Sequence, residues 1–418
     1  LAHGIGRLGV LHGRRAPSTL LPADEGRRWE MNETPARSVT PLLFAAMAIF
    51  VFTVSIGILN GTDLVDFGHG TILAHVHSGT LGWITLSIFA ATAWIFGADR
   101  LPRLLRDGSI AAVVAYVLTF WGDLTDLRPV TGTLMLAAIV WFAVWTFGVR
   151  RGQTLTVPKL SMLLSQVNLV IGGVLGVLLG LMLAGVIDIS DGMQGAHPAM
   201  MVVGYLILAG AAIDERLIGG PGTDGMTRGG RWQAWLFFSA GIFLAVGILF
   251  DVMPLLGLNL LFEVIGVAIV LVRHRSRLAS VGWGPASPAR FGAASILFLV
   301  PALAILGYVI VRYSEDIDAT PVRLLLALDH TTFIGILTNA IFGLLFVAAA
   351  ARRAVWSWAD QPVFWAINLG VAGFVIGLVA DAAAIKRIAT PLMGVGILLG
   401  LLVVAMRLRA PSAEPAPG

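Results

Sequence analysis

The sequence predicts an all-α membrane protein with about twelve transmembrane helices. Of its 418 residues, 57% are hydrophobic and only 12% are charged, and the mean hydropathy is +0.87. These values lie far outside the usual range of soluble globular domains. Apolar segments long enough to cross a bilayer recur along most of the chain. We therefore expect a multi-pass protein of a cell (inner, cytoplasmic) membrane.

The two ends of the chain differ from the rest in composition. Residues 1–38 are rich in Arg and Gly and contain no apolar run, so we expect a disordered cytoplasmic tail without the core of a signal peptide. Within this tail, Met31 is a candidate for the true start of the protein. Residues 39–409 form the expected membrane domain, and residues 410–418 are expected to form a second disordered tail.

The membrane domain divides into apolar segments separated by short polar connections. The expected spans are approximately residues 41–59, 70–97, 109–121, 129–148, 159–186, 196–213, 232–250, 254–273, 290–311, 322–350, 363–384 and 388–406.

The connections between these spans alternate in charge, which predicts their orientation. One set is basic and includes Arg100, Arg103, Arg106, Arg150, Arg151, Lys159, Arg216, Arg228, Arg231, Arg273, Arg275, Arg277, Arg352, Arg353, Arg407 and Arg409. The other set is acidic or mixed and includes Asp63, Asp66, Asp123, Asp126, Asp188, Asp191, Asp251, Glu315, Asp316, Asp318, Asp381 and Lys386. By the positive-inside rule both termini are cytoplasmic. The net charge of +4 is then an orientation signal, and no nucleic-acid partner is expected.

Four histidines lie within spans that run in the same direction. His75 and His77 are on the second span, His197 on the sixth and His330 on the tenth, all in the outer part of the membrane. Their hosts recur every fourth span, which predicts three four-helix arcs around a pseudo-threefold axis. Since His75 and His77 are two residues apart, they point about 200° apart on a helix. The second span is therefore expected to form a wall between two separate sites.

The residue types at these sites favour a metal cofactor. The chain has no cysteine, which excludes disulfides, thiolate-held iron–sulfur clusters and covalent c-type haem. Clustered neutral imidazoles suit b-type haem iron, or a copper or non-haem iron centre. A single intramembrane histidine also serves as a hydrogen bond between helices, but four at one depth favour ligation. The neighbouring small residues leave room for a flat ring or for close helix packing: Gly79, Gly82, Gly195, Gly204 and Gly335.

The segment HGTILAHVHSGTLG, residues 69–82, resembles the tenth helix of the catalytic subunit of haem–copper oxidases and nitric-oxide reductases. That family also has twelve spans in three arcs, with haems in the outer part of the membrane. The elements HPAMMVVGY and DHTTFIGI are similar to the NnrS family, twelve-span haem proteins linked to nitric-oxide stress. Outside these short elements the resemblance is architectural.

The resemblance implies particular roles for the four histidines. Carried over with a rotation of one arc, it makes His77 and His197 the axial pair of a low-spin haem b. His75 becomes the axial ligand of a second haem b, with His330 on the distal side. The chain has no adjacent pair of histidines, whereas the family's copper or non-haem iron centre needs three. We therefore do not predict proton-pumping oxygen reduction.

Other polar residues have two interpretations each. Lys386 and Arg387 resemble the basic pair that binds haem propionates in the oxidase family. The alternative interpretation is that they are plain surface charges. Glu263 is read as a proton carrier or non-haem iron ligand, or as a protonated side chain bonded to a neighbouring helix. Asp329 is expected to meet another helix or the other haem site. His330 and Glu263 are the candidates for a catalytic role.

The sequence thus predicts a haem-b-binding membrane protein that transfers electrons, or that binds or reduces nitric oxide or oxygen. Whether it is an oxidoreductase stays open. The expected partners are membrane lipid and, because no soluble haem domain is present, quinol or a redox partner protein. The alternatives are a proton-coupled transporter using a His/Glu cluster and a copper-handling membrane factor. A transporter usually consists of two matching halves, whereas the four-helix period favours three units.

Overall fold

The structure is a computed structural model that describes residues 35, 37–219, 225–285 and 287–412. Most of the expected N-terminal tail, including Met31, and residues 413–418 of the expected C-terminal tail lie outside the described residues. Residues 410–412 are held against the chain, since Arg353 N donates to Pro411 O at 3.1 Å and Ser412 pairs with Arg352.

The described part of the chain is helical and contains no β-strand, so the all-α prediction is confirmed. Within the described ranges, twelve helices are long and apolar enough to cross a membrane. In chain order these are α2 (Thr40–Gly61); α3 (His69–His77) with η2 (Ser78–Thr85) and α4 (Leu86–Ile95); α5 (Arg103–Trp121); η3 (Thr125–Leu127) with α6 (Arg128–Val149); α7 (Val157–Leu183); α8 (Met193–Ala199) with η4 (Met200–Leu206) and α9 (Ile207–Gly219); α10 (Arg228–Leu249); α11 (Met253–Ser280); α12 (Ala289–Tyr313); α13 (Val322–His330) with η6 (Thr331–Thr338) and α14 (Asn339–Ala349); η7 (Ser357–Ala359) with α15 (Asp360–Val379); and α16 (Ala383–Arg409). Two further single turns are η1 (Arg37–Val39) and η5 (Ile317–Ala319).

The boundaries differ from the expected spans mainly where charges sit at a helix end. The third span begins at Arg103, six residues before the expected start, and α11 continues to Ser280 past the expected end at residue 273. Both extensions carry Arg residues, which an apolar-run criterion excludes. A helix satisfies its own backbone hydrogen bonds, however, so it continues into the polar region beyond the apolar run.

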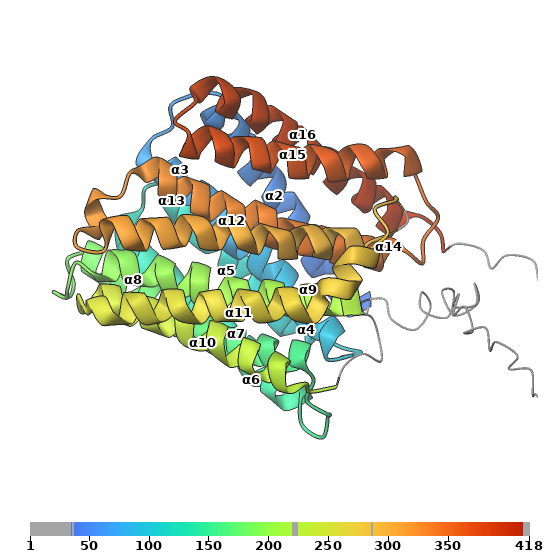
Figure 1. The fold of residues 1–418 in the computed structure, drawn as a ribbon, viewed down its shortest axis with the longest axis horizontal. Coiled ribbons are helices and arrows are strands. Elements are labelled where there is room, and N and C mark those ends of the chain that lie inside the picture. The colour runs from blue at the N-terminus through green and yellow to red at the C-terminus, as the bar shows by residue number, and fades with distance from the viewer. Residues whose placement is uncertain (1–34, 36, 220–224, 286, 413–418) are drawn as a thin grey trace, which may run out of the picture.

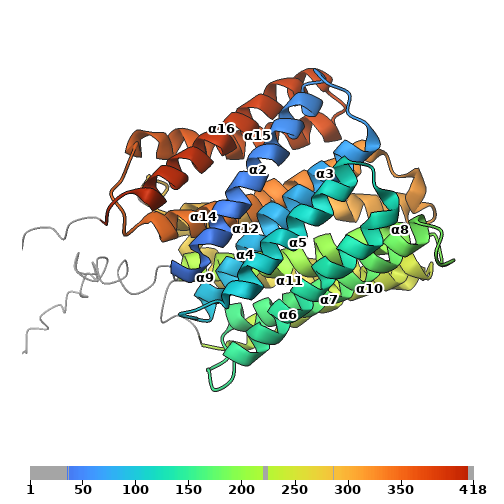
Figure 2. The ribbon, with the colours of Figure 1, turned by 180° about the vertical axis from the view of Figure 1, so that it is seen from behind.

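The second, sixth and tenth spans form the centre of the bundle. Their apolar windows are 89%, 83% and 78% buried, whereas the other nine spans range from 22% to 56%. In Figures 1 and 2 the remaining helices surround this centre, and α2 starts at the same end of the bundle at which α16 finishes. The four predicted histidines therefore belong to the three innermost spans.

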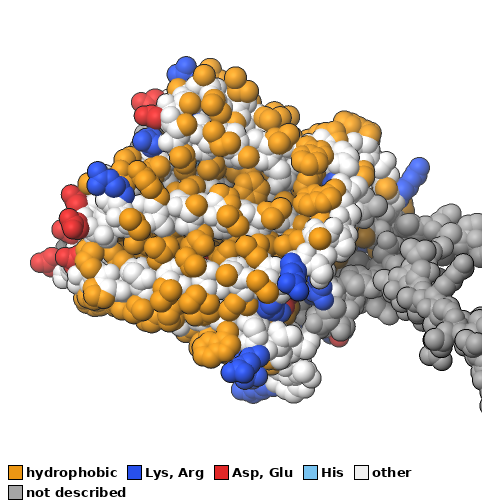
Figure 3. All heavy atoms as spheres, in the orientation of Figure 1, with side chains coloured by type: hydrophobic (Ala, Val, Ile, Leu, Met, Phe, Trp, Pro, Cys, Tyr) orange, Lys and Arg blue, Asp and Glu red, His pale blue; other side chains and the backbone are white. Residues whose placement is uncertain are grey.

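The outer surface has the character of a lipid-facing bundle. Large apolar side chains such as Val144, Val395 and Leu369 are 64%, 59% and 58% exposed. In Figure 3 hydrophobic side chains cover the long sides of the helices and charged side chains gather toward their ends. Since so much exposed apolar surface is unusual for a soluble protein, the chain is a multi-pass membrane protein.

Several spans end in the same backbone conformation. Asp63, Asp123, Asp251 and Asp381 follow α2, α5, α10 and α15, with φ angles of 58°, 52°, 53° and 54°. Aspartate tolerates this left-handed conformation better than most residues because its short side chain bonds locally. The acidic connections predicted from charge alternation thus include four sharp helix ends of similar conformation.

Candidate functional site: two histidine-lined cavities

The three central spans share a change of helical form next to their histidines. Each changes from α-helix to a widened π-helical stretch: η2, η4 and η6. His77 and His330 directly precede η2 and η6, while His75 and His197 lie three positions before η2 and η4. π-helical stretches are rare and frequently occur at functional sites. Each histidine therefore lies either one or three residues before a π-helical stretch, and the second span has a histidine at both of these positions.

A set of hydrogen bonds joins the π-helical stretches to one another. Trp83 Nε1 donates to Thr338 Oγ1 at 3.0 Å, and Tyr205 Oη donates to Thr85 Oγ1 at 3.3 Å. Trp83 and Tyr205 are the sixth residues of η2 and η4, and Thr85 and Thr338 are the eighth residues of η2 and η6. Each threonine in turn donates to the carbonyl five residues earlier, at 2.9 and 2.8 Å. Equivalent positions therefore make equivalent contacts between neighbouring units.

Two of the imidazoles bond to a neighbouring helix. His75 Nδ1 lies 2.9 Å from Thr53 O on α2, and His197 Nδ1 lies 2.9 Å from Gly172 O on α7. A carbonyl oxygen only accepts hydrogen bonds, so in each ring Nδ1 carries the proton and donates it. The lone pair of Nε2 is then left for another partner. A metal-bound histidine usually donates its other ring N–H to a carbonyl or a carboxylate in the same way.

The other two imidazoles bond within their own helix. His77 Nδ1 donates to Leu73 O and His330 Nδ1 donates to Leu326 O, both at 2.8 Å and both four residues back. All four rings thus have Nδ1 satisfied by a backbone carbonyl and Nε2 free of any protein hydrogen bond among the described contacts.

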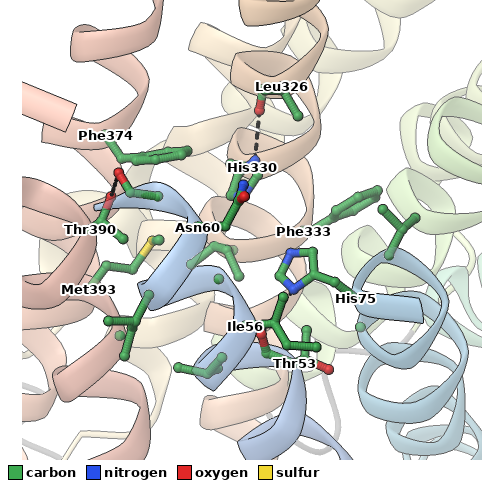
Figure 4. A pocket seen from close by; sticks show the side chains of 18 of the residues that line it. Thr53, Ile56, Asn60, His75, Leu326, His330, Phe333, Phe374, Thr390 and Met393 are labelled. Atoms are coloured by element: carbon green, nitrogen blue, oxygen red, sulfur yellow. Dashed lines mark hydrogen bonds between the residues drawn. The ribbon is translucent and has the colours of Figure 1, made fainter. Parts of the chain in front are cut away.

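His75 and His330 line the larger of two cavities, which we call cavity 1. Its volume is about 460 Å³, within the usual range of ligand sites. Figure 4 shows the two rings entering it from different elements, with Phe333, Phe374 and Met393 among its other walls.

His77 and His197 line the second cavity, cavity 2, with a volume of about 300 Å³. Phe120 stacks on the His77 ring with centroids 4.0 Å apart and planes 12° apart, and Tyr116 meets it edge-on at 5.5 Å. The two rings that lie on opposite faces of the second span thus line different cavities. One cavity is shared with the tenth span and the other with the sixth.

Glycines shape both cavities, but most of them are not the glycines expected from the sequence. A Cβ on Gly57 would stand 3.1 Å from His75 Cε1, and one on Gly176 would stand 2.8 Å from His197 Cε1. Of the expected glycines, Gly79 lines cavity 1. The others instead allow close packing: a Cβ would meet Ile49 at Gly82, Ile248 at Gly195, Met200 and Gly241 at Gly204, and Phe298 at Gly335.

Each cavity has one cation in its lining. Lys386 lines cavity 1, and its Nζ lies 2.7 Å from Asp63 Oδ1. Arg387 also bonds Asp63, at 2.7 Å, but is not part of the lining. These two hydrogen bonds lower the pKa of the Asp63 carboxyl below its usual value. In cavity 2 the cation is Arg128, whose Nη2 lies 2.7 Å from Asp123 Oδ1.

Sequence reasoning missed Arg128, Tyr116 and Phe120. Arg128 begins α6 on the same side of the bundle as the histidines, and a search for cations at the outer ends of spans would have found it. Tyr116 and Phe120 have ordinary helical spacing among apolar neighbours, so nothing in the sequence distinguishes them from packing residues.

The wall between the two cavities is made by a few shared residues. Val76, Asp329 and Phe333 line both cavities. Asp329 was expected to meet another helix or the other site, and it lies on this wall. Glu263 lines neither cavity. Among the described residues, no three His, Asp or Glu side chains are grouped closely enough to hold a metal ion together.

No protein-family model matches the chain, and no curated protein is similar enough to it to serve as a relative.

Proposed function

We propose that this protein binds haem b at two sites, through His77 and His197 in cavity 2 and through His75 in cavity 1, with His330 on the distal side of the second haem. The observation that carries the proposal is the pairing itself. Each cavity contains two imidazoles, and the two imidazoles of each pair come from different spans.

The residues present fit such a group. Four neutral imidazoles with Nδ1 bonded to carbonyls offer Nε2 as the ligand atom, which is the usual donor to haem iron. Glycines on two helices line cavity 2 and leave room for a flat ring, Gly132 on α6 and Gly173, Gly176 and Gly180 on α7. A haem iron needs at most two nitrogen ligands from the protein, so a third histidine is not required in either cavity. Lys386 and Arg128, which pair with Asp63 and Asp123, line the cavities and would be the cations available to the carboxylate groups of a haem.

Haem b held in these cavities would supply reversible one-electron chemistry and, at an open coordination position, an iron that binds small gases. The protein's contribution is to hold the imidazoles and to exclude water. Phe120 and Tyr116 fix the His77 ring, which favours permanent ligation in cavity 2. Cavity 1 is larger, and its His330 ring has a tilted contact with Phe374 at 4.7 Å in place of the close stacking on His77, which favours gas binding there.

The wider architecture proposed is that of three four-helix arcs. The equivalent registers of η2, η4 and η6, the repeated contacts between them and the aspartates that end α5, α10 and α15 support a pseudo-threefold arrangement. The alternating charges of the connections support a cytoplasmic location for both termini, with the cavities toward the outer side of an inner membrane. The resemblance to haem–copper oxidases and nitric-oxide reductases supports the same arrangement.

The proposed role is electron transfer, or binding or reduction of nitric oxide or oxygen. Electrons would come from quinol in the membrane or from a redox partner protein. Oxygen reduction at a copper centre is not part of the proposal, because the histidines for that centre are lacking in the sequence.

The test is an absorption spectrum of detergent-purified protein, oxidised and reduced with dithionite, with a pyridine haemochrome count. We expect two haems per chain. His77→Ala or His197→Ala should abolish the sharp reduced band of a bis-histidine haem. His75→Ala should abolish the component that shifts with carbon monoxide or nitric oxide, and His330→Ala should change the size of that shift. The matched control is His274→Ala, which removes a buried imidazole outside both cavities and should leave the spectrum unchanged.

A colourless protein after haem supplementation would overturn the proposal. Bound copper without haem would then favour a copper-handling factor, and proton-coupled uptake in vesicles would favour a transporter.

A further inference from the structure

The third contact between the central spans differs from the two that form the cavities. At the positions equivalent to the histidines, the sixth span has Ala199 directly before η4, and the tenth span has Leu328 three residues before η6. This contact therefore has no pair of imidazoles. Instead Leu328 lines a small internal space of about 10 Å³, the size of a single water molecule.

This small space is lined by two polar side chains in an otherwise apolar surrounding. They are Glu263 from α11 and Thr332 from η6, which are 2% and 0% exposed. Glu263 Oε1 and Thr332 Oγ1 are both buried without a hydrogen-bond partner. The other lining residues are Val202, Val203, Ile207, Val267, Leu299, Ala302, Leu303, Leu306 and Leu328.

Three other buried acids in the described chain each have a side-chain partner for at least one carboxyl oxygen, although Asp214 Oδ1 is itself unpartnered. Asp214 bonds Ser295 at 2.6 Å, Glu215 pairs with Arg273, and Asp360 pairs with Arg407 at 2.7 Å. No Lys, Arg, His or second acid lines the space around Glu263. An isolated carboxylate is costly inside a membrane, and unsatisfied buried polar atoms cost about 1–3 kcal/mol each. A proton on Glu263 removes the first cost, and a water bridging Glu263 and Thr332 removes the second.

We propose that Glu263 and Thr332 bind one internal water at this third contact, with Glu263 holding a proton, and that this site senses the charge of the cofactor in cavity 1. Thr332 connects the two, because it lies in η6 two residues after His330. A change of charge at His330 shifts η6 relative to α11 and alters the hydrogen bond to Glu263. The sensing part rests on the proposed haem function, whereas the water and proton site does not.

The experiment is infrared spectroscopy of the carboxylic acid C=O stretch in purified protein, first prepared without haem. We expect a band from a protonated acid that Glu263→Gln removes. Thr332→Val should shift the band to higher frequency, because the bridging hydrogen bond is lost. The matched control is Thr331→Val, since the Thr331 hydroxyl already donates to Ala327 O and should not affect the band. Asp214→Asn should likewise leave it in place.

The second measurement uses the haem-loaded protein and records the reduced-minus-oxidised difference. We expect the Glu263 band to shift on reduction, and His330→Ala to eliminate that shift. Absence of a Glu263 band without haem, or a band indifferent to Thr332→Val, would overturn the water site. A band that passes those tests but is unchanged on reduction would overturn the sensing. If no haem is bound, the first measurement still decides the site.

Discussion

The contact between Gly176 and His197 gives a graded test of how the cavities hold their ligands. A Cβ at Gly176 would stand 2.8 Å from His197 Cε1, whereas ordinary contact begins at 3.4 Å, so in Gly176→Ala the ring must retreat by about 0.6 Å. At Gly57 the corresponding distance is 3.1 Å, and the His75 ring must retreat by about 0.3 Å. Functional groups generally tolerate displacements of about 0.5 Å. The two substitutions therefore fall on opposite sides of that tolerance.

The retreat in Gly176→Ala also strains the hydrogen bond from His197 Nδ1 to Gly172 O. Loss of such outer-shell support typically weakens metal binding about 10- to 100-fold. We expect a loss of haem affinity of this size in cavity 2 and a smaller loss in cavity 1 for Gly57→Ala. The assay is haem titration of the protein purified without haem, followed by absorption.

The control is Gly257→Ala, at a helical glycine whose Cβ would meet nothing within 4 Å. It should keep full affinity, and alanine there favours the helix by up to about 1 kcal/mol. Thermal unfolding of each variant reports whether the fold is kept. A folded Gly176→Ala protein with unchanged haem affinity and spectrum would refute the reasoning, as would a larger loss in Gly57→Ala than in Gly176→Ala.

Three further outcomes follow from packing and charge. Gly241→Ala would place a Cβ against the backbone of Gly204, and neither helix backbone can move aside. The substitution should lower the unfolding free energy by about 1–3 kcal/mol or more, measured by denaturation in mixed detergent. Wild-type stability in this variant would show that α10 and η4 can separate freely. Asp360→Asn should lower the unfolding free energy by about 3–5 kcal/mol in the same assay, because it leaves the buried Arg407 charge unpaired. Unchanged stability would mean that water reaches the pair. Lys386 and Arg387 lower the pKa of Asp63, so their pairing with Asp63 stabilises the protein above about pH 3.8, and this stabilisation is lost as the pH falls through the lower pKa of the folded state. Asp63→Asn should therefore flatten the acid part of a plot of melting temperature against pH. An identical pH profile in wild type and variant would contradict this expectation.

The fold was largely predictable because its signals are local. Bilayer-length apolar runs and the charges between them identify twelve helices without any knowledge of contacts, and the errors occur where Arg residues extend a helix, as at Arg103 and after residue 273. The angular separation of His75 and His77 likewise follows from helix geometry alone. It correctly places the two rings in different cavities.

The surroundings of the histidines were less predictable because they depend on contacts between distant segments. The carbonyls of Thr53 and Gly172 accept from His75 and His197, yet backbone groups carry no sequence signature. Gly57 and Gly176 look like any other helical glycine until the facing ring is known. The change to π-helix within the central spans also has no simple pattern, since η2, η4 and η6 share only a Gly at their fifth position.

That change of helical form sets the angular phase between the two ends of each central span. A π-helical turn accommodates one more residue than an α-helical turn, and each α-helical residue accounts for about 100° of rotation. Were η2 wound as α-helix without loss of a residue, His75 and His77 would therefore rotate by about 100° around the axis relative to α4, whereas deleting one residue from η2 would restore an α-helical turn and keep their orientation. The ligand-bearing end and the packing end of each span are thus independent segments whose relative rotation a single residue determines.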